Sequence, residues 1–176
     1  DSIVLEEGDI TDLSSLIRVF RRYSPTHIYN LAAQSFVPTS WKQPILTSTV
    51  TGLGAVNVFE AARLTCPNAK IYQASSSEMF GLQPADTKQN EKTSFYPRSP
   101  YGCAKAYAHH MAVNYRDSYG MFICCGILFN HESPRRGTNF VTNKVVKGAV
   151  EIKKGLKNNL RLGNLDSSRD WGHSYD

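Results

Sequence analysis

The sequence predicts an α/β fold with a doubly wound parallel sheet, and two patterns support this. Short apolar runs alternate with longer segments whose apolar residues recur at helical spacing. This alternation repeats several times along 176 residues, which favours crossover connections and a parallel sheet with helices on both faces. The length is sufficient for one sizeable hydrophobic core.

Each expected element has a local signal. A short strand at 3–5 is followed by a turn at Gly8-Asp9, and Thr11 or Asp12 can cap a helix that ends at Ser24-Pro25. The remaining expected elements are a strand at 27–31, a loop through 35–38, a helix at 45–64, a strand at 69–74, a polar loop at 81–100, a helix at 101–119, a central strand at 122–128 and a helix at 139–154.

Composition narrows the function classes. The net charge of +5 would suit an anionic ligand or merely aid solubility, and no dense basic stripe indicates nucleic acid binding. No apolar run is long enough to predict a membrane span. The four cysteines lack C-x-x-C spacing, so we expect a reduced, cytoplasmic protein. His109-His110 has no acidic or cysteine companions at ligand spacing, so we expect no metal site.

Ligands of doubly wound sheets bind beyond the carboxyl ends of the strands. Four segments directly follow expected strands and are therefore candidates for the site. They are residues 8–12, 31–35, 75–78 and 129–137.

Tyr101 and Lys105 stand four residues apart at the start of an expected helix, so they share one face. A tyrosine with a pKa of about 10 is a poor base at neutral pH. A neighbouring ammonium and an oxidised nicotinamide would lower that pKa by favouring the phenolate. This spacing also arises by chance on surface helices, so by itself it is weak evidence.

The segment Ser75-Ser76-Ser77-Glu78 follows the neighbouring expected strand. A hydroxyl there could hydrogen-bond a substrate oxygen, and the carboxylate could move a proton from carbon. The alternative is a helix N-cap or a serine-rich turn. Together with Tyr101 and Lys105, the segment favours a catalytic site.

Four segments of the sequence resemble the GDP-mannose 4,6-dehydratases, which are extended short-chain dehydrogenases/reductases. The resemblance covers essentially the whole chain, and the third segment is the most specific. The segments are residues 73–81 (QASSSEMFG), 95–105 (FYPRSPYGCAK), 126–137 (GILFNHESPRRG) and 162–172.

The resemblance implies roles for four catalytic residues. Tyr101 would be the base at the sugar C4 hydroxyl, and Lys105 would hold the nicotinamide ribose and lower the tyrosine pKa. Glu78 would take the C5 proton and help to expel water from C6. Ser76 stands where the family usually has threonine, and it keeps the hydroxyl.

The resemblance also implies binding residues. Cofactor-binding positions would be Asp9, Ile10, Leu31, Ala32, Ala33, Gln34, Ser35, Leu46, Tyr101, Lys105, His131 and Arg136, and substrate-binding positions Asn130, Lys144 and Arg169. Leu46 stands where a tyrosine often lines the cofactor. His131 could instead be a capped loop histidine, and Arg136 a solvated side chain. Gly52-Leu53-Gly54 is expected within a helix, not in a phosphate loop.

The implied fold is Rossmann-like and incomplete, lacking the first βα unit and most of the C-terminal substrate domain. Residues 1–138 would form a partial NADP-binding domain and residues 139–176 the start of the sugar-nucleotide region. We expect the chain to be truncated at both ends and, if isolated, inactive. The intact protein would convert GDP-mannose to GDP-4-keto-6-deoxymannose with NADP, as a homo-oligomer (dimer or tetramer). The alternatives are another nucleotide-sugar dehydratase or epimerase, or a catalytically inactive NADP-binding fragment.

Overall fold

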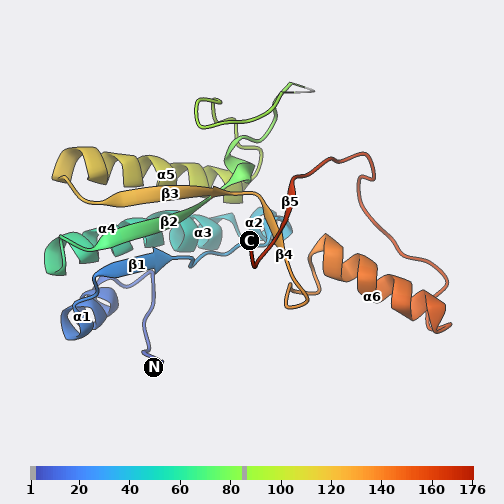
Figure 1. The fold of residues 1–176 in the computed structure, drawn as a ribbon, viewed down its shortest axis with the longest axis horizontal. Coiled ribbons are helices and arrows are strands. Elements are labelled where there is room, and N and C mark those ends of the chain that lie inside the picture. The colour runs from blue at the N-terminus through green and yellow to red at the C-terminus, as the bar shows by residue number, and fades with distance from the viewer. Residues whose placement is uncertain (1–2, 85–86) are drawn as a thin grey trace. The chain divides into compact units, whose positions relative to one another are not determined.

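The computed structural model describes residues 3–84 and 87–176, which form two compact units, Asp1–Ile127 and Leu128–Asp176. Strands and helices alternate in the first unit (Figure 1). Its elements are α1 (Leu13–Tyr23), β1 (His27–Asn30), α2 (Val37–Lys42), α3 (Pro44–Thr47), the π-helix η1 (Ser48–Leu53), α4 (Gly54–Thr65), β2 (Lys70–Ser76), the 3₁₀ helix η2 (Ser77–Met79), α5 (Pro100–Tyr119) and β3 (Ile123–Leu128).

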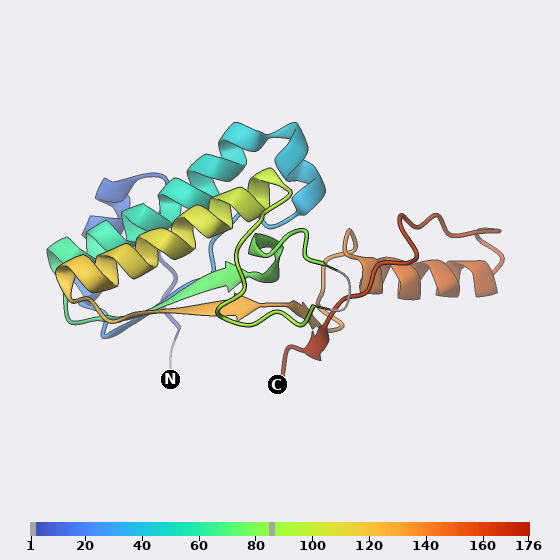
Figure 2. The ribbon, with the colours of Figure 1, turned by 90° about the horizontal axis from the view of Figure 1, so that it is seen from above.

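The sheet of the first unit has the strand order β1-β2-β3. β1 and β2 are parallel, with His27 opposite Lys70 and Asn30 opposite Gln73, and β3 runs in the same direction (Figure 1). Helices α4 and α5 lie together on one face of this sheet (Figure 2). The predicted α/β parallel sheet is confirmed. The prediction that 122–128 is the central strand is wrong, because β2 lies between β1 and β3 in the described sheet.

The core of the first unit fills the space between α4, α5 and the helix-facing side of the sheet. Phe59 and Ala112 are fully buried there, and Ile71 and Ile123 face them from the strands. Small residues on α5 allow α4 and the sheet to approach closely, which gives the dense packing that protein interiors require. These contacts fix α5 against β2, and both elements carry candidate catalytic residues.

The helical stretch Pro44–Thr65 is apolar and long enough to cross a membrane by length and composition alone. Half of it is buried in the protein, where Ala55, Phe59 and Ala62 belong to the core. Core packing therefore accounts for the buried half of its apolar residues, whereas Ile45, Leu46, Leu53 and Leu64 are exposed. Gly52 and Gly54 lie within this helical stretch, as expected, and a Cβ at Gly54 would lie 2.9 Å from the Ile10 side chain.

Two expected elements differ from the structure. Residues 3–5 are exposed and form no strand, because no described strand supplies the hydrogen-bonding neighbour that extended backbone needs. The expected loop at 35–38 contains the start of α2. Proline is tolerated in that first turn because a helix does not use those N–H groups.

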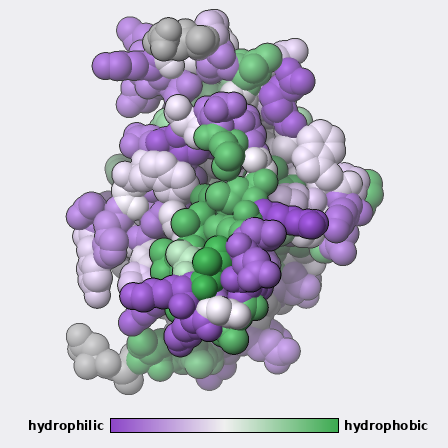
Figure 3. Space-filling view, turned by 90° about the vertical axis from the view of Figure 1, so that its right-hand side faces the viewer, coloured by the Kyte–Doolittle hydropathy of each residue, from purple (hydrophilic) through white to green (hydrophobic). Residues whose placement is uncertain are grey.

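The second unit contains β4 (Asn130–Glu132), α6 (Val141–Lys153) and β5 (Trp171–His173). β4 and β5 form a parallel pair in which His131 lies opposite Gly172. Gly148 is the buried residue of α6, where a Cβ would meet the side chain of Leu160. Large apolar side chains remain exposed in both units, and one face of the molecule shows hydrophobic surface bordered by hydrophilic side chains (Figure 3).

Candidate functional site

The helix-facing side of the sheet changes from apolar to polar toward the carboxyl ends of its strands. Ile28 pairs with Ile71, and two residues later Asn30 pairs with Gln73. Asn30 Nδ2 donates to Gln73 Oε1 at 2.7 Å, and both residues are buried. Buried amides are costly unless hydrogen-bonded. The polar end of the sheet is therefore an ordered platform for the residues that follow the strands.

The predicted cofactor-lining segment 31–35 follows β1 directly. Gln34 anchors it: its backbone N–H donates to Thr51 Oγ1 at 3.1 Å, and its Oε1 accepts from Thr47 Oγ1 at 3.0 Å. Leu31, Ala32 and Ser35 are exposed and Ala33 is half-buried. The segment is thus held by α3 and the π-helix, while part of its backbone stays accessible to a ligand.

The other predicted cofactor positions of the first unit differ in surroundings. Asp9 is exposed, and its pKa is lowered by hydrogen bonds from the Thr11 N–H and hydroxyl, each 2.8 Å long. Ile10 packs against the core, and its carbonyl accepts from Asn57 Nδ2. Leu46 is 47% exposed on α3. Their cofactor contacts stay predictions.

Tyr101 and Lys105 lie one turn apart on α5, which begins with Ser99 as N-cap. Lys105 is 3% exposed, and its Nζ donates to the carbonyl of Ala74 at 2.8 Å. The same Nζ lies 5.8 Å from the centre of the Tyr101 ring. Burial lowers the pKa of Lys105 to about 8. At neutral pH most of the lysine is still an ammonium, and its charge favours a phenolate at Tyr101.

Ser76 and Glu78 lie at the carboxyl end of β2. Ser76 Oγ accepts from the Glu78 N–H at 3.2 Å, so Ser76 is the N-cap of η2. Ser76 is 8% exposed and Glu78 is half-buried. A Cβ at Gly102 would lie 2.7 Å from the Glu78 carbonyl, so the turn packs directly on α5. The structure therefore brings all four candidate catalytic residues to adjoining segments, and it also confirms the N-cap reading of Ser76.

One buried polar contact of this region was missed in the sequence. Ser75 Oγ lies 3.0 Å from His109 Nδ1, one turn beyond Lys105 on α5. Burial, followed by the charges of His110 and Arg116, lowers the pKa of His109. Burial also raises the pKa of the Cys125 thiol, which a hydrogen bond with Ser75 partly offsets. The spacing of Tyr101, Lys105 and His109 at four-residue steps is a signal that could have revealed His109.

In the second unit, Asn130 lies on β4, and its Nδ2 donates to the carbonyl of Asp170 at 3.1 Å. His131 also lies on β4, not in a loop, and its Nδ1 lies 3.3 Å from the carbonyl of Phe129. Its ring is exposed, so its predicted cofactor contact is neither supported nor opposed by this geometry.

Arg136 is not simply solvated. Its Nε lies 3.5 Å from Glu132 Oε1, and its guanidinium stacks over the Phe140 ring at 3.6 Å. Lys144 and Arg169 are exposed, as charged groups that meet a ligand phosphate would be. Their substrate contacts stay predictions.

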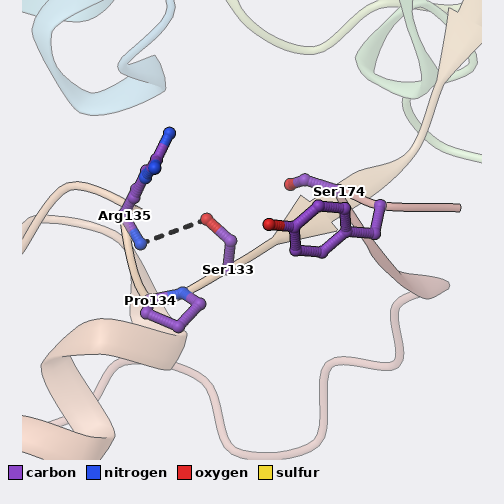
Figure 4. Close-up of a pocket in the computed structure, with 5 residues that line it drawn as sticks. Ser133, Pro134, Arg135 and Ser174 are labelled. Carbon is purple, nitrogen blue, oxygen red and sulfur yellow. Dashed lines mark hydrogen bonds between the residues drawn. The ribbon is translucent and has the colours of Figure 1, made fainter.

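A pocket of about 290 Å³ lies in the second unit (Figure 4). It is lined by Ser133, Pro134, Arg135, Ser174 and Tyr175. Ser133 Oγ accepts from the Arg135 N–H at 3.1 Å and so shapes the loop. The catalytic candidates do not line this pocket. Ser133, Pro134 and Arg135 lie in segment 129–137, which the sequence marked as a candidate for the site. Ser174 and Tyr175 follow β5, whose pairing with β4 has no local sequence signal.

Comparison with known proteins places this geometry in a family. The family model for "GDP-mannose 4,6 dehydratase" matches residues 1–176. GDP-mannose 4,6-dehydratases from Vibrio cholerae and Drosophila melanogaster are each 50% identical to the chain, over 99% and 98% of its length. These matches cover 47% and 44% of the two relatives, so the chain spans about half the length of the curated relatives it matches.

Solved structures agree on the fold. RMD from Pseudomonas aeruginosa, complexed with NADPH, has a TM-score of 0.89 and 25% identity, over 98% of this chain and 59% of that one. The UDP-glucose 4-epimerase of Thermus thermophilus, in complex with NAD, has a TM-score of 0.80 and 28% identity, over 94% and 54%. The fold is therefore the Rossmann-like fold of these nucleotide-sugar enzymes, and the chain belongs to the GDP-mannose 4,6-dehydratase family.

Proposed function

We propose that the protein containing this chain converts GDP-mannose to GDP-4-keto-6-deoxymannose, with NADP as its cofactor. The observation that carries the proposal is that a tyrosine–lysine pair and a separate carboxylate lie on adjoining elements. Tyr101 and Lys105 share one face of α5, and Glu78 lies on the turn that packs against the start of that helix. Curated relatives of this family at about half identity carry the same activity in their names.

The Tyr101–Lys105 pair suits removal of a proton from the sugar C4 hydroxyl. The buried ammonium of Lys105 is fixed by its bond to Ala74, so its charge acts on Tyr101 from a constant position. Tyr101 is 9% exposed, so little water competes for its oxygen. A phenolate stabilised in this way would accept the hydroxyl proton as hydride leaves C4.

Glu78 suits the elimination that follows. Once C4 is a ketone, the proton on C5 becomes acidic, and a carboxylate can carry it from C5 to the departing C6 hydroxyl. Ser76 fixes the turn through the Glu78 N–H, so its hydroxyl contributes to positioning whether or not it also meets the substrate. Water is lost with no net change in oxidation state.

The described residues fit a nicotinamide cofactor. An ammonium has three donors, of which Lys105 uses one on Ala74, so the other two can meet ribose hydroxyls. The accessible segment 31–35 lies at the carboxyl end of β1, where such sheets bind dinucleotides. When bound, the nicotinamide would take the hydride from C4 and return it to C6. RMD, the structural relative solved with NADPH, supports the choice of NADP.

An epimerase that acts at C4 is the second candidate, because the structural relatives include a UDP-glucose 4-epimerase. Such an enzyme oxidises and reduces the same carbon and does not need a carboxylate for elimination. Glu78 at the end of β2 therefore favours the dehydratase.

Replacing Glu78 by glutamine in the intact protein tests the proposal. Glutamine keeps the size and hydrogen bonding of glutamate but accepts no proton at neutral pH. We expect oxidation at C4 to continue while elimination slows by about a hundredfold or more. Mixed in a single turnover with GDP-mannose, the Glu78→Gln enzyme should accumulate the absorbance of reduced nicotinamide and release little 4-keto-6-deoxy product.

Glu91→Gln is the matched control, because Glu91 is exposed in the polar loop that connects the two catalytic segments and has no proposed role. It should behave as the unmodified enzyme in absorbance, product and melting temperature. Product release at the native rate by Glu78→Gln would remove Glu78 from the mechanism. Epimerised GDP-sugar without a 4-keto product from the unmodified enzyme would favour the second candidate.

A further inference from the structure

The inward face of α5 continues beyond the Tyr101–Lys105 pair. Tyr101, Lys105 and His109 follow one another at four-residue steps, so they share a face of the helix. Lys105 Nζ donates to the carbonyl of Ala74, and His109 Nδ1 hydrogen-bonds Ser75 Oγ at 3.0 Å. Two successive turns of α5 thus hold two successive residues of β2.

Ser75 lies immediately before the turn that carries Glu78. Ser76 caps that turn through the Glu78 N–H, and Ser75 itself is 3% exposed. A small displacement of Ser75 would therefore move the cap and, with it, the Glu78 carboxylate. Catalysis by such a carboxylate depends on its position to within about half an ångström.

His109 also contacts the far side of the same turn through Phe95. The His109 and Phe95 rings meet edge to face with centres 5.1 Å apart. Phe95 in turn meets Phe80, the residue directly after η2, with ring centres 5.4 Å apart. The His109 imidazole thereby contacts Ser75, before the turn, directly, and it reaches Phe80, after the turn, through the ring of Phe95.

We propose that His109 is a positioning residue that braces the turn bearing Glu78, so that substitution of His109 slows turnover without weakening ligand binding. This inference rests on the proposed function for its effect on turnover, but the brace itself can be observed without activity. A neutral imidazole suits the role, because Phe95 and the buried strand surround it with little water. The lowered pKa of His109 agrees with that state.

The test compares three variants of the intact protein. His109→Phe keeps a flat ring against Phe95 but loses the bond to Ser75. His109→Asn restores a polar atom near the position of Nδ1, so it can renew that bond. His110→Phe is the control, because His110 also meets Phe95, with ring centres 5.6 Å apart, yet lies on the exposed side of α5.

Amide hydrogen exchange of the peptide covering residues 75–81 reports the brace directly. We expect it to rise by about fivefold in His109→Phe and to stay near the native rate in the other two variants. The kcat for GDP-mannose should fall about tenfold in His109→Phe, with KM within about twofold, and recover to within about threefold of native in His109→Asn.

Unchanged exchange at residues 75–81 in His109→Phe would overturn the brace. Faster exchange with an unchanged kcat would overturn the role of His109 in turnover. An equal loss of kcat in His109→Phe and His110→Phe would overturn it as well. If the unmodified protein does not dehydrate GDP-mannose, the proposed function fails, and the exchange measurement still decides the brace.

Discussion

Helix α4 of the first unit buries Phe59, Ala61 and Ala62 completely, whereas helix α6 of the second unit buries only Gly148 among its described residues. Both helices are of similar length and carry apolar residues at helical spacing. The difference lies in their neighbours: α4 packs between α1, α5 and the sheet, while α6 meets the segment at Leu160. Helical periodicity therefore predicts the helix in both units but does not predict how deeply it is buried.

The same contrast separates the candidate functional residues. Tyr101 and Lys105 are buried, and Lys105 is fixed by a short hydrogen bond, whereas Lys144 and Arg169 of the second unit are exposed. Proton transfer requires fixed geometry, which buried and hydrogen-bonded groups provide, whereas a charged group that binds a nucleotide has to be accessible to it. We infer that the first unit supplies the chemistry and the second supplies contacts to the substrate.

Equivalent truncations in the two helices should give very different losses of stability. Phe59→Ala removes a fully buried ring, so the intact protein should lose about 3–5 kcal/mol of unfolding free energy. Val146→Ala in α6 removes a side chain that is 64% exposed and should change it by at most about 0.5 kcal/mol. Denaturant titration of both variants measures this. Equal losses would mean that Val146 is covered in the intact protein.

The activity of the Tyr101–Lys105 pair should depend strongly on the phenolic oxygen of Tyr101. Tyr101→Phe removes the phenol but keeps the ring packing, so turnover should fall by at least about a hundredfold while the melting temperature stays near native. Steady-state kinetics with a thermal melt checks both expectations. If turnover survives, another group must act at C4, and the division of labour between the units would need revision.

Local patterns predicted most of the first unit and, in the second, the helix α6 but not the strand pair. The Asp12 cap, the helix end at Ser24-Pro25 and the alternation of strands with long helices are short-range signals, and they located α1, β1, β2, α5 and β3 closely. Strand order is a long-range property, so 122–128 was wrongly expected at the centre of the sheet. The β4–β5 pair joins residues about 40 apart, which no local signal reveals.

The candidate site follows the same rule. Tyr101, Lys105, Ser76 and Glu78 stand in motifs that can be read from the sequence, and the structure brings their segments together. The Ser75–His109 contact joins residues 34 positions apart, so spacing alone could suggest only that His109 faces inward. Arg136 was left open as a solvated side chain, yet an ion pair with Glu132 and stacking on Phe140 hold it. Such partners emerge only when the chain is folded.

The smallest expected effect is a change in stability, because the buried charge of Lys105 destabilises the first unit. Its pKa is about 8 in the folded protein and 10.5 when free, because burial disfavours the ammonium. Between these two values the unfolded chain binds more protons than the folded one, so the lysine's contribution to stability rises with pH. Below pH 8 both states are charged, and the folded state carries the whole cost of burial.

Lys105→Met removes the free-energy cost of burying the ammonium. It also removes the hydrogen bond to Ala74, which offsets about 1 kcal/mol of that cost in the native protein. At pH 7 we therefore expect the variant to be inactive but about 1–2 kcal/mol more stable than the native protein. Denaturant titrations of both proteins from pH 7 to pH 10.5 measure the difference, in which the titration of all other groups cancels. The gain should shrink steadily above pH 8. A variant less stable at pH 7, or a gap independent of pH, would mean that Lys105 is not held as a buried ammonium, and the electrostatic account of Tyr101 would fail with it.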